Sequence, residues 1–223
     1  MACRQQQSWF DGETRMKATI LTSRPIGHLC YEWAREHVPE DWEVSVAQEH
    51  ENLDFGDIVI SLQYERIITK FREGVRYYNF HPAILPQYAG ASCLSWVIIN
   101  GEKESGITLH ELVREIDAGD IIDTHKFLVT DKDTAETLHH RTEEKLLQEF
   151  KKWFPILLLE RPKGVKQDRS LRRVYKRKDL DSQKDLTRFV RALTFQGKEN
   201  SFFTTRDGRI YALDYEKGIT EIR

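Results

Sequence analysis

The sequence predicts an α/β fold in which a mostly parallel sheet is extended by antiparallel strands. Short apolar runs rich in β-forming residues recur at 17–23, 42–47, 57–62 and 75–80, and helical or loop segments separate them. Strands that alternate with helices pair in parallel through right-handed crossovers. After about residue 105 two longer strand-like runs follow each other closely, which favours an antiparallel pair added to the sheet.

Two helices are predicted around these strands. Apolar residues at helical spacing follow the first strand and indicate a helix that ends near residue 38. Asp133 with Glu136 is a capping-box signal, because a short polar side chain and a glutamate three residues later satisfy each other's backbone groups. The apolar positions after this signal predict a long helix that ends near Pro155 or slightly beyond it.

The C-terminal part differs in composition from the rest. A basic tract with few apolar residues, 161–180, is interpreted as an excursion over the surface. A helix at about 182–194 follows, and then a hairpin in SFFTTRDGRIYALDY, with RDGR as its turn. We therefore divide the chain into a flexible extension or cloning artefact at 1–15, a main domain at 16–160 and a small C-terminal subdomain at 161–223.

Composition excludes several classes of function. The 223 residues carry a formal charge of −2, and the charged residues are balanced in sign, so we expect no nucleic-acid or membrane surface. No apolar run of about 18 residues exists, so no transmembrane helix is expected. The three cysteines are widely spaced, which indicates a reducing, cytoplasmic compartment. His139 and His140 are adjacent and lack metal-ligand spacing, so no metal is predicted.

The strand that contains YNFH ends in polar residues. Asn79 and His81 are two positions apart and so face the same side of the strand. Ligands bind at this end of the strands in a parallel sheet, and Pro82 biases His81 toward an extended backbone. A lone histidine after a strand is more often an ordinary loop residue. Asp117 in the turn REIDAG could orient a histidine and stabilise its cation, although a turn aspartate often bonds its own backbone.

Taken together, YNFHPAILPQYAGASCLSWVIINGEKESGITLHELVREIDAGDII closely resembles the formyltransferases that use 10-formyltetrahydrofolate. The shared frame is N-x-H-P-x-x-L-P, Y-x-G, W-x-I-x-x-G-E, G-(I/V)-T-x-H and (I/V)-D-x-G-x-I-I. The resemblance implies a Rossmann-like formyltransferase fold, with Asn79, His81 and Asp117 as the catalytic trio and 10-formyltetrahydrofolate as the formyl donor. It also implies a cis peptide bond between Leu85 and Pro86.

The resemblance places the folate between two segments. DIVISLQYERII resembles the strand and loop that contact the pterin in this family, mostly through backbone groups. The segment that leads into Asp117 is expected to form the opposite wall. The folate-lining residues implied in this way are Gln63, Tyr64, Arg66, Ile67, Leu112, Val113, Arg114, Glu115 and Ile116.

The implied trio suits the chemistry of formyl transfer. When an amine attacks the formyl carbon, a tetrahedral oxyanion forms, and the amide of Asn79 can donate to it. His81 can move the proton of the attacking amine or stabilise charge on the intermediate. Asp117 can fix the tautomer of His81 and favour its protonated form. The sequence leaves open whether His81 or Asp117 is the primary base.

Three acceptor amines are plausible within the family. Glycinamide ribonucleotide requires a glycine-rich phosphate loop after the first strand, whereas SRPIGHLC contains one glycine. Enzymes for methionyl-tRNA usually have a further C-terminal domain and a basic face, and a net charge of −2 disfavours that acceptor. A nucleotide-linked amino sugar fits better, because YKRKDL, RALTF and the hairpin after them resemble the C-terminal segment of sugar N-formyltransferases.

The leading hypothesis is a sugar N-formyltransferase for a nucleotide-linked amino-dideoxy sugar, such as dTDP-4-amino-4,6-dideoxyglucose, in lipopolysaccharide or cell-surface glycan synthesis. A homodimer is implied by the same resemblance. Ala89 and Ser92 replace an arginine and an asparagine in the YRGAN phrase of many sugar enzymes, so the diphosphate is expected to bind differently. The implied acceptor contacts are Ser92, Trp96, Tyr175, Lys176, Arg177 and Phe202.

Two alternatives remain from the sequence. One is a compact formyltransferase that acts on another amine, such as glycinamide ribonucleotide. The other is a non-catalytic protein that keeps the fold and binds folate or nucleotide. The presence of all three trio residues disfavours the second alternative.

Overall fold

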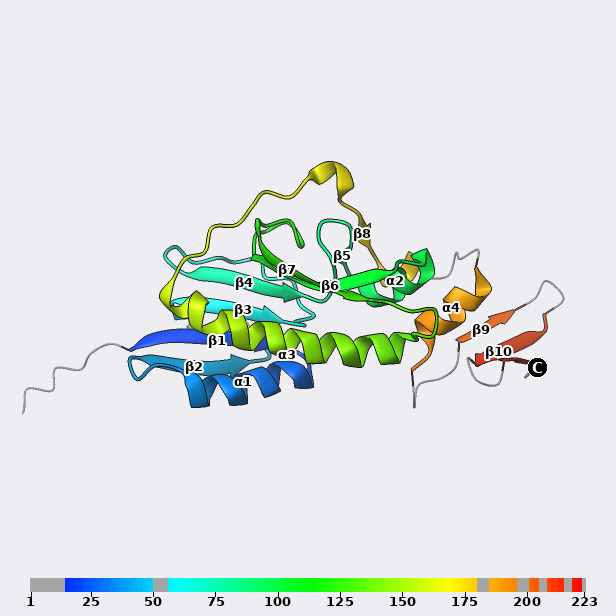
Figure 1. Ribbon diagram of the computed structural model, residues 1–223, viewed down its shortest axis with the longest axis horizontal. Helices are drawn as coiled ribbons and strands as arrows, with labels where there is room; N and C mark the ends of the chain where they lie inside the picture. Colours follow the sequence, from blue (N-terminus) through cyan, green and yellow to red (C-terminus); the bar gives the residue numbers. More distant parts are fainter. Residues whose placement is uncertain are drawn as a thin grey trace, which may run out of the picture.

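The computed structural model describes residues 15–49, 56–179, 185–195, 201–204, 208–214 and 218–221. The predicted strands of the main domain form one six-stranded sheet in the order β2-β1-β3-β4-β6-β7 (Figure 1). Its parallel strands are β1 (Met16–Thr22), β2 (Trp42–Ala47), β3 (Ile58–Leu62) and β4 (Arg76–His81), and its antiparallel strands are β6 (Glu104–Glu111) and β7 (Ile121–Leu128). The predicted α/β fold with an added antiparallel pair is therefore confirmed.

Two helices pack on one face of this sheet and determine which residues face the other side. α1 (Pro25–His37) and α3 (Ala135–Leu159) share an apolar core with Tyr78 and Phe80 of β4. The rings of Phe80 and Phe150 lie 5.9 Å apart in this core. Because side chains alternate along a strand, burial of Phe80 under α3 directs Asn79 and His81 to the opposite face.

The N-terminus of α3 lies one residue later than its capping signal predicts. Thr134 is the N-cap, and its hydroxyl accepts from the backbone N–H of Thr137, whose own hydroxyl accepts from the backbone N–H of Thr134. Asp133 instead accepts a hydrogen bond from the Thr137 hydroxyl. The predicted capping box of Asp133 with Glu136 is wrong, because Thr134 and Thr137 satisfy the backbone N–H groups at the start of the helix.

The C-terminal end of α3 is stabilised by an arginine from the sheet. The helix passes Pro155 and ends at Leu159. Arg76 of β4 donates to the carbonyl oxygens of Leu157 and Glu160, at 2.8 Å and 2.7 Å. A cation at these carbonyls satisfies backbone acceptors that have no partner within the helix. This contact caps the C-terminal end of the helix.

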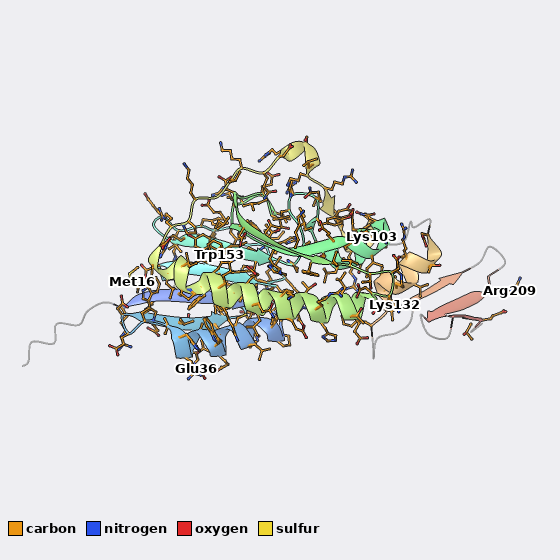
Figure 2. The ribbon with its side chains drawn as sticks, viewed as in Figure 1. Met16, Glu36, Lys103, Lys132, Trp153 and Arg209 are labelled. Carbon is orange, nitrogen blue, oxygen red and sulfur yellow. The ribbon has the colours of Figure 1, made fainter. Side chains whose placement is uncertain are left out.

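Trp153 fixes α3 to the edge of the sheet. Its indole Nε1 donates to Asp123 of β7 at 2.9 Å, and Lys152 donates to the same carboxylate at 2.8 Å. Figure 2 shows Trp153 in the C-terminal half of the helix, beside the sheet. The antiparallel pair is therefore attached to the core of the parallel strands through α3.

Three further elements of the structure are not predicted from the sequence patterns. They are β5 (Ala89–Gly90), α2 (Cys93–Asn100) and β8 (Val174–Tyr175), of which β5 and β8 pair in parallel. The tract interpreted as a surface excursion thus contributes a strand, with η1 (Arg169–Leu171) before it and η2 (Arg177–Asp179) after it. The predicted cis bond between Leu85 and Pro86 is present.

The C-terminal part extends from one end of the molecule (Figure 1). The predicted helix is observed as α4 (Leu186–Leu193), and Arg191 attaches it to the body by donating to the carbonyl oxygen of Asp131 at 2.6 Å. Lys103 and Lys132 lie at this end of the body (Figure 2). The predicted hairpin forms as β9 (Ser201–Thr204) and β10 (Ile210–Asp214), and β11 (Gly218–Glu221) adds a third strand.

Among the described residues, no helix combines the length and the apolar character that a membrane crossing needs.

Candidate active site

The register between β4 and β6 brings polar residues together on the sheet face opposite α3. Asn79 pairs across the strands with His110, and His81 pairs with Thr108. All four side chains are buried. Thr108 accepts from the backbone N–H of Leu85 and donates to the carbonyl oxygen of Ala83. This threonine therefore stabilises the turn that follows His81, and buried polar groups of this kind need such partners.

His110 determines the direction of the Asn79 amide. Nδ1 of His110 lies 2.7 Å from the carbonyl oxygen of Glu111, which can only accept, so Nδ1 carries the hydrogen. Nε2 of His110 then accepts from Nδ2 of Asn79 at 3.1 Å. Burial lowers the pKa of His110 to about 4, while Asp117 opposes this shift. His110 is therefore neutral at neutral pH.

His81 is charged in the same environment. Its Nε2 donates to the carbonyl oxygen of Tyr88 at 2.6 Å, and its Nδ1 lies 3.6 Å from Oδ1 of Asp117. Burial lowers the pKa of His81, but the carboxylate of Asp117, the side chain of Cys93 and the carbonyl oxygen of Tyr88 together outweigh burial and raise the pKa to about 10. The thiol of Cys93 lies 3.6 Å from Nε2 and donates to the carbonyl oxygen of Gly90. His81 is therefore an imidazolium at neutral pH.

Asp117 lies between the two imidazoles. Its Oδ1 is 3.6 Å from Nδ1 of His81 and 3.7 Å from Nε2 of His110. Its Oδ2 accepts from the backbone N–H of Gly90 at 2.8 Å. The Asp117 side chain is 11% exposed, more than either histidine, so it is the most accessible of the three side chains. The structure thus brings together all three residues of the trio predicted from the sequence.

Positive backbone φ angles mark the same region. The described non-glycine residues with a positive φ are Gln63 at 50°, Ser92 at 59° and Asp117 at 50°. Side chains rarely adopt this conformation, which is commonest at binding and catalytic sites. Each of these residues belongs to a different predicted part of the site: the folate lining, the acceptor contacts and the catalytic trio.

A comparison with known protein families identifies this arrangement. The family model described as formyl transferase matches residues 45–152, which include Asn79, His81 and Asp117. This part of the chain is similar to the formyl transferase family. No group of three or more histidine, cysteine, aspartate or glutamate side chains that could bind a metal ion occurs in the described part of the chain.

Solved formyltransferases share the fold over most of this chain. An N-formyltransferase from Helicobacter canadensis, in complex with folinic acid and dTDP-3-aminofucose, is 18% identical, covers 92% of this chain and 98% of its own, and has a TM-score of 0.68. A 4-N formyltransferase from Francisella tularensis is 18% identical, covers 87% and 95%, and has a TM-score of 0.73. A methionyl-tRNA formyltransferase from Clostridium thermocellum is 20% identical, covers 92% and 96%, and has a TM-score of 0.69. At these identities the likeness shows a common fold.

The two predicted folate walls are neighbours. Tyr64 from one segment and Leu112 from the other pack against the same apolar cluster beneath them. Three apolar side chains of these walls are exposed: Ile67 at 59%, Val113 at 41% and Ile116 at 42%. Exposed apolar side chains that gather near polar groups are typical of a ligand site.

The polar members of the predicted folate walls have other contacts. Arg66 forms an exposed ion pair with Glu49 at 3.2 Å, and Glu115 forms one with Arg169 at 2.9 Å. Arg114 is exposed, and Gln63 is half-buried. Arg66 and Glu115 therefore lie at the rim of the walls rather than beneath them.

The predicted acceptor contacts lie in different surroundings. The ring centroids of Trp96 and Tyr175 lie 4.8 Å apart, and Tyr88 stacks on Tyr175 with its centroid at 5.2 Å. Lys176 and Arg177 follow β8 and are exposed. Ser92 precedes α2 directly. Phe202 lies in β9, and its side chain is outside the described residues.

Sequence reasoning missed two residues that contact the trio. His110 is the last residue of the G-(I/V)-T-x-H part of the frame, but its position beside Asn79 depends on the strand register. Gln167 donates to the carbonyl oxygen of Asp117 from a tract that was interpreted as surface. No local pattern marks this glutamine, because its partner is 50 residues away in the sequence.

Proposed function

We propose that the protein transfers the formyl group of 10-formyltetrahydrofolate to the amine of a nucleotide-linked amino sugar. The observation that supports formyl transfer best is the position of Asp117 between a charged His81 and a neutral His110, with Asn79 beside them. The exposed apolar side chains of Ile67, Val113 and Ile116 suit the flat ring of a folate.

The protonation states favour Asp117 as the proton acceptor. His81 carries a proton at neutral pH, so it cannot accept another from the attacking amine. The carboxylate of Asp117 is the more exposed of the two groups, and as an anion it can accept a proton. A positioned base of this kind contributes about 10²–10⁴ to the rate.

His81 and Asn79 would stabilise the oxyanion of the tetrahedral intermediate. The positive charge of His81 is buried, so its attraction for developing negative charge is weakly screened. One hydrogen of the Asn79 amide is donated to His110, which leaves the second hydrogen for the oxyanion. His110 therefore determines where this second hydrogen points.

The sugar acceptor rests on two kinds of support. The C-terminal segment from YKRKDL to the hairpin resembles the sugar N-formyltransferases, and two structures with the same fold are N-formyltransferases, one of them with dTDP-3-aminofucose bound. A methionyl-tRNA enzyme has the same fold, but this chain has a net charge of −2, which disfavours an RNA acceptor.

Purified protein with 10-formyltetrahydrofolate and a panel of dTDP-, UDP- and GDP-linked amino sugars tests the proposal. We expect a formylated sugar, detected by mass spectrometry. Turnover of glycinamide ribonucleotide or methionyl-tRNA in preference to every sugar would overturn the sugar acceptor. Folate binding without any formylated product would support the non-catalytic alternative.

We also propose a homodimer in the cytoplasm. The support is the resemblance of the tail to sugar enzymes that pair through their C-terminal parts, and two buried free thiols, Cys30 and Cys93, that suit a reducing compartment. Light scattering after size exclusion would give the mass of the particle, and a monomer at micromolar concentration would contradict the dimer.

A further inference from the structure

One segment of the C-terminal part crosses the site and contacts both of its loops. We call residues 164–175 the strap; Figure 1 draws it in yellow, above the sheet. Val165 exchanges two backbone hydrogen bonds with Ile121, of 2.8 Å and 2.7 Å. The end of the strap is β8, which pairs with β5. The strap therefore connects the region after Asp117 to the loop after His81.

Gln167 is the residue of the strap that contacts the Asp117 turn most directly. Its Nε2 donates to the carbonyl oxygen of Asp117 at 2.9 Å and to that of Gly119 at 2.7 Å. Both partners are carbonyl oxygens, which only accept, so the direction of the amide is fixed and both of its hydrogens are used. Its Oε1 is buried, without a hydrogen-bond partner among the described residues.

The turn that Gln167 contacts has an unusual backbone. Asp117 has a φ of +50°, which favours glycine. A Cβ at Gly119 would lie 1.8 Å from the carbonyl oxygen of Glu111, so the turn closes tightly against β6. The two hydrogen bonds of Gln167 hold the carbonyl groups of Asp117 and Gly119, directly after this strained torsion, where they oppose rotation of the peptide groups between them.

Other strap residues act on the segment before the turn. Arg172 donates to the carbonyl oxygen of Ile116 and lies 3.4 Å from Glu115, which also pairs with Arg169. The pair of Glu115 with Arg169 is exposed, and exposed ion pairs contribute little. Gln167 is therefore the strap side chain with hydrogen bonds to the backbone of Asp117 itself.

We propose that Gln167 is a positioning residue that keeps the Asp117 carboxylate between His81 and His110. It touches neither the formyl donor nor the acceptor in this proposal, and it acts through the backbone of the turn. The effect on turnover rests on the proposed formyl transfer, whereas the effect on the geometry of Asp117 does not.

The first test replaces Gln167 with methionine, which has a similar volume but no donor. We expect kcat to fall by up to about 10²-fold, with little change in the KM for 10-formyltetrahydrofolate, because a small displacement of a catalytic group costs this much. Gln148→Met is the matched control, because Gln148 lies exposed on α3 and donates nothing to the site. The control should retain the wild-type kcat.

The second readout needs no substrate. The groups that face His81 are Asp117, Cys93, His110 and the carbonyl oxygen of Tyr88, and Asp117 raises its pKa more than Cys93 or the Tyr88 carbonyl does. In Gln167→Met the carboxylate is no longer fixed, so the pKa of His81 should fall from about 10, since burial remains and the contribution of Asp117 is weaker. Titration of ¹⁵N-labelled histidines by NMR measures this change.

The outcomes separate the proposal from its alternatives. An unchanged His81 pKa in folded Gln167→Met overturns it, and a lower kcat accompanied only by lower thermal stability would make Gln167 merely structural. If Gln167→Met does not fold, Gln167→Asn, which keeps the amide at a shorter reach, should show a smaller shift in the same direction. If the wild type forms no formylated product, the proposed function fails, but the titration still decides the role of Gln167.

Discussion

At the scale of single residues, two buried histidines near one carboxylate differ in charge because their partners differ. His110 donates to a backbone carbonyl and accepts from Asn79, so it needs no second proton. His81 donates to a carbonyl through Nε2 and faces Asp117 through Nδ1, so the second proton is stabilised. The neutral histidine orients an amide, and the charged one supplies an electrostatic field.

Substitution of His81 by asparagine should remove this field. We expect the kcat of formyl transfer to fall by about 10²–10⁴, while the binding of folate and acceptor remains nearly unchanged. Steady-state kinetics and calorimetric binding separate the two effects. His140→Asn is the control, because His140 is exposed on α3. Wild-type turnover in His81→Asn would remove this residue from the mechanism.

Substitution of His110 by leucine should act through Asn79. The Asn79 amide loses its acceptor, so its remaining hydrogen no longer points at the oxyanion, and kcat should fall by up to about 10²–10³, the value of one oxyanion donor. In a double-mutant cycle, His110→Leu should cost little more once Asn79→Ala is present. Additive losses would show that His110 acts independently of Asn79.

At the scale of elements, the contact between β5 and β8 depends on a glycine. Gly90 has a φ of +90°, and a Cβ there would lie 2.4 Å from the carbonyl oxygen of Tyr175. Its N–H also donates to Asp117. The pairing of two very short strands therefore positions the backbone N–H that donates to the carboxylate of Asp117.

Replacement of Gly90 by alanine should separate the two strands. We expect the free energy of unfolding to fall by about 1–3 kcal/mol, and turnover to fall as well. Gly74→Ala is a matched control, because Gly74 has a φ of +82° but no atom within 4 Å of its added Cβ. Urea unfolding measures the loss of stability in both variants. Gly74→Ala introduces backbone strain alone, whereas Gly90→Ala adds a steric clash with Tyr175. An equal loss in both would mean that the contact with β8 contributes nothing.

The strands of the sheet could be predicted because each is an apolar run between turn signals. α2 could not, because Cys93, Val97, Ile98 and Ile99 are all buried and the apolar run shows no helical period. The predicted N-cap of α3 differs from the observed one by one residue. Asp133 and Thr134 are both good capping residues, and local sequence does not choose between them.

The candidate site was predictable to the extent that its residues lie on one strand or in one turn. Spacing alone places Asn79 and His81 on a common face. The position of His110 beside Asn79 requires the register of the antiparallel pair β4 and β6, which the local sequence does not give. The contact of Gln167 requires the path of a charged tract whose composition is typical of a surface loop.

At the scale of the whole molecule, the two histidines make stability depend on pH in opposite directions. The pKa of His81 is raised to about 10, so its contribution to stability is fully present below about 6.5 and is lost as the pH rises through about 10. The pKa of His110 is lowered to about 4, so stability is lost as the pH falls from about 6.5 toward 4.

The contribution of this pair to stability should therefore be greatest near pH 6.5. Urea midpoints of the wild type and of His81→Asn, measured from pH 6 to pH 10, test the alkaline side. We expect the difference between the two proteins to be largest at the acidic end of this range and to shrink as the pH rises. A difference that is constant with pH would contradict a charged His81.

The position of the strap in the chain has a consequence for synthesis. Every residue that the strap contacts in the site is made before it, because the ribosome adds residues from the N-terminus and early parts of a chain fold first. When α3 has emerged, Asn79, His81, His110 and Asp117 are all present, but the donor to the Asp117 turn is not. A growing chain therefore contains the residues of the candidate site early. The side chain that donates to the Asp117 turn can take its place only when residues 164–175 have left the ribosome.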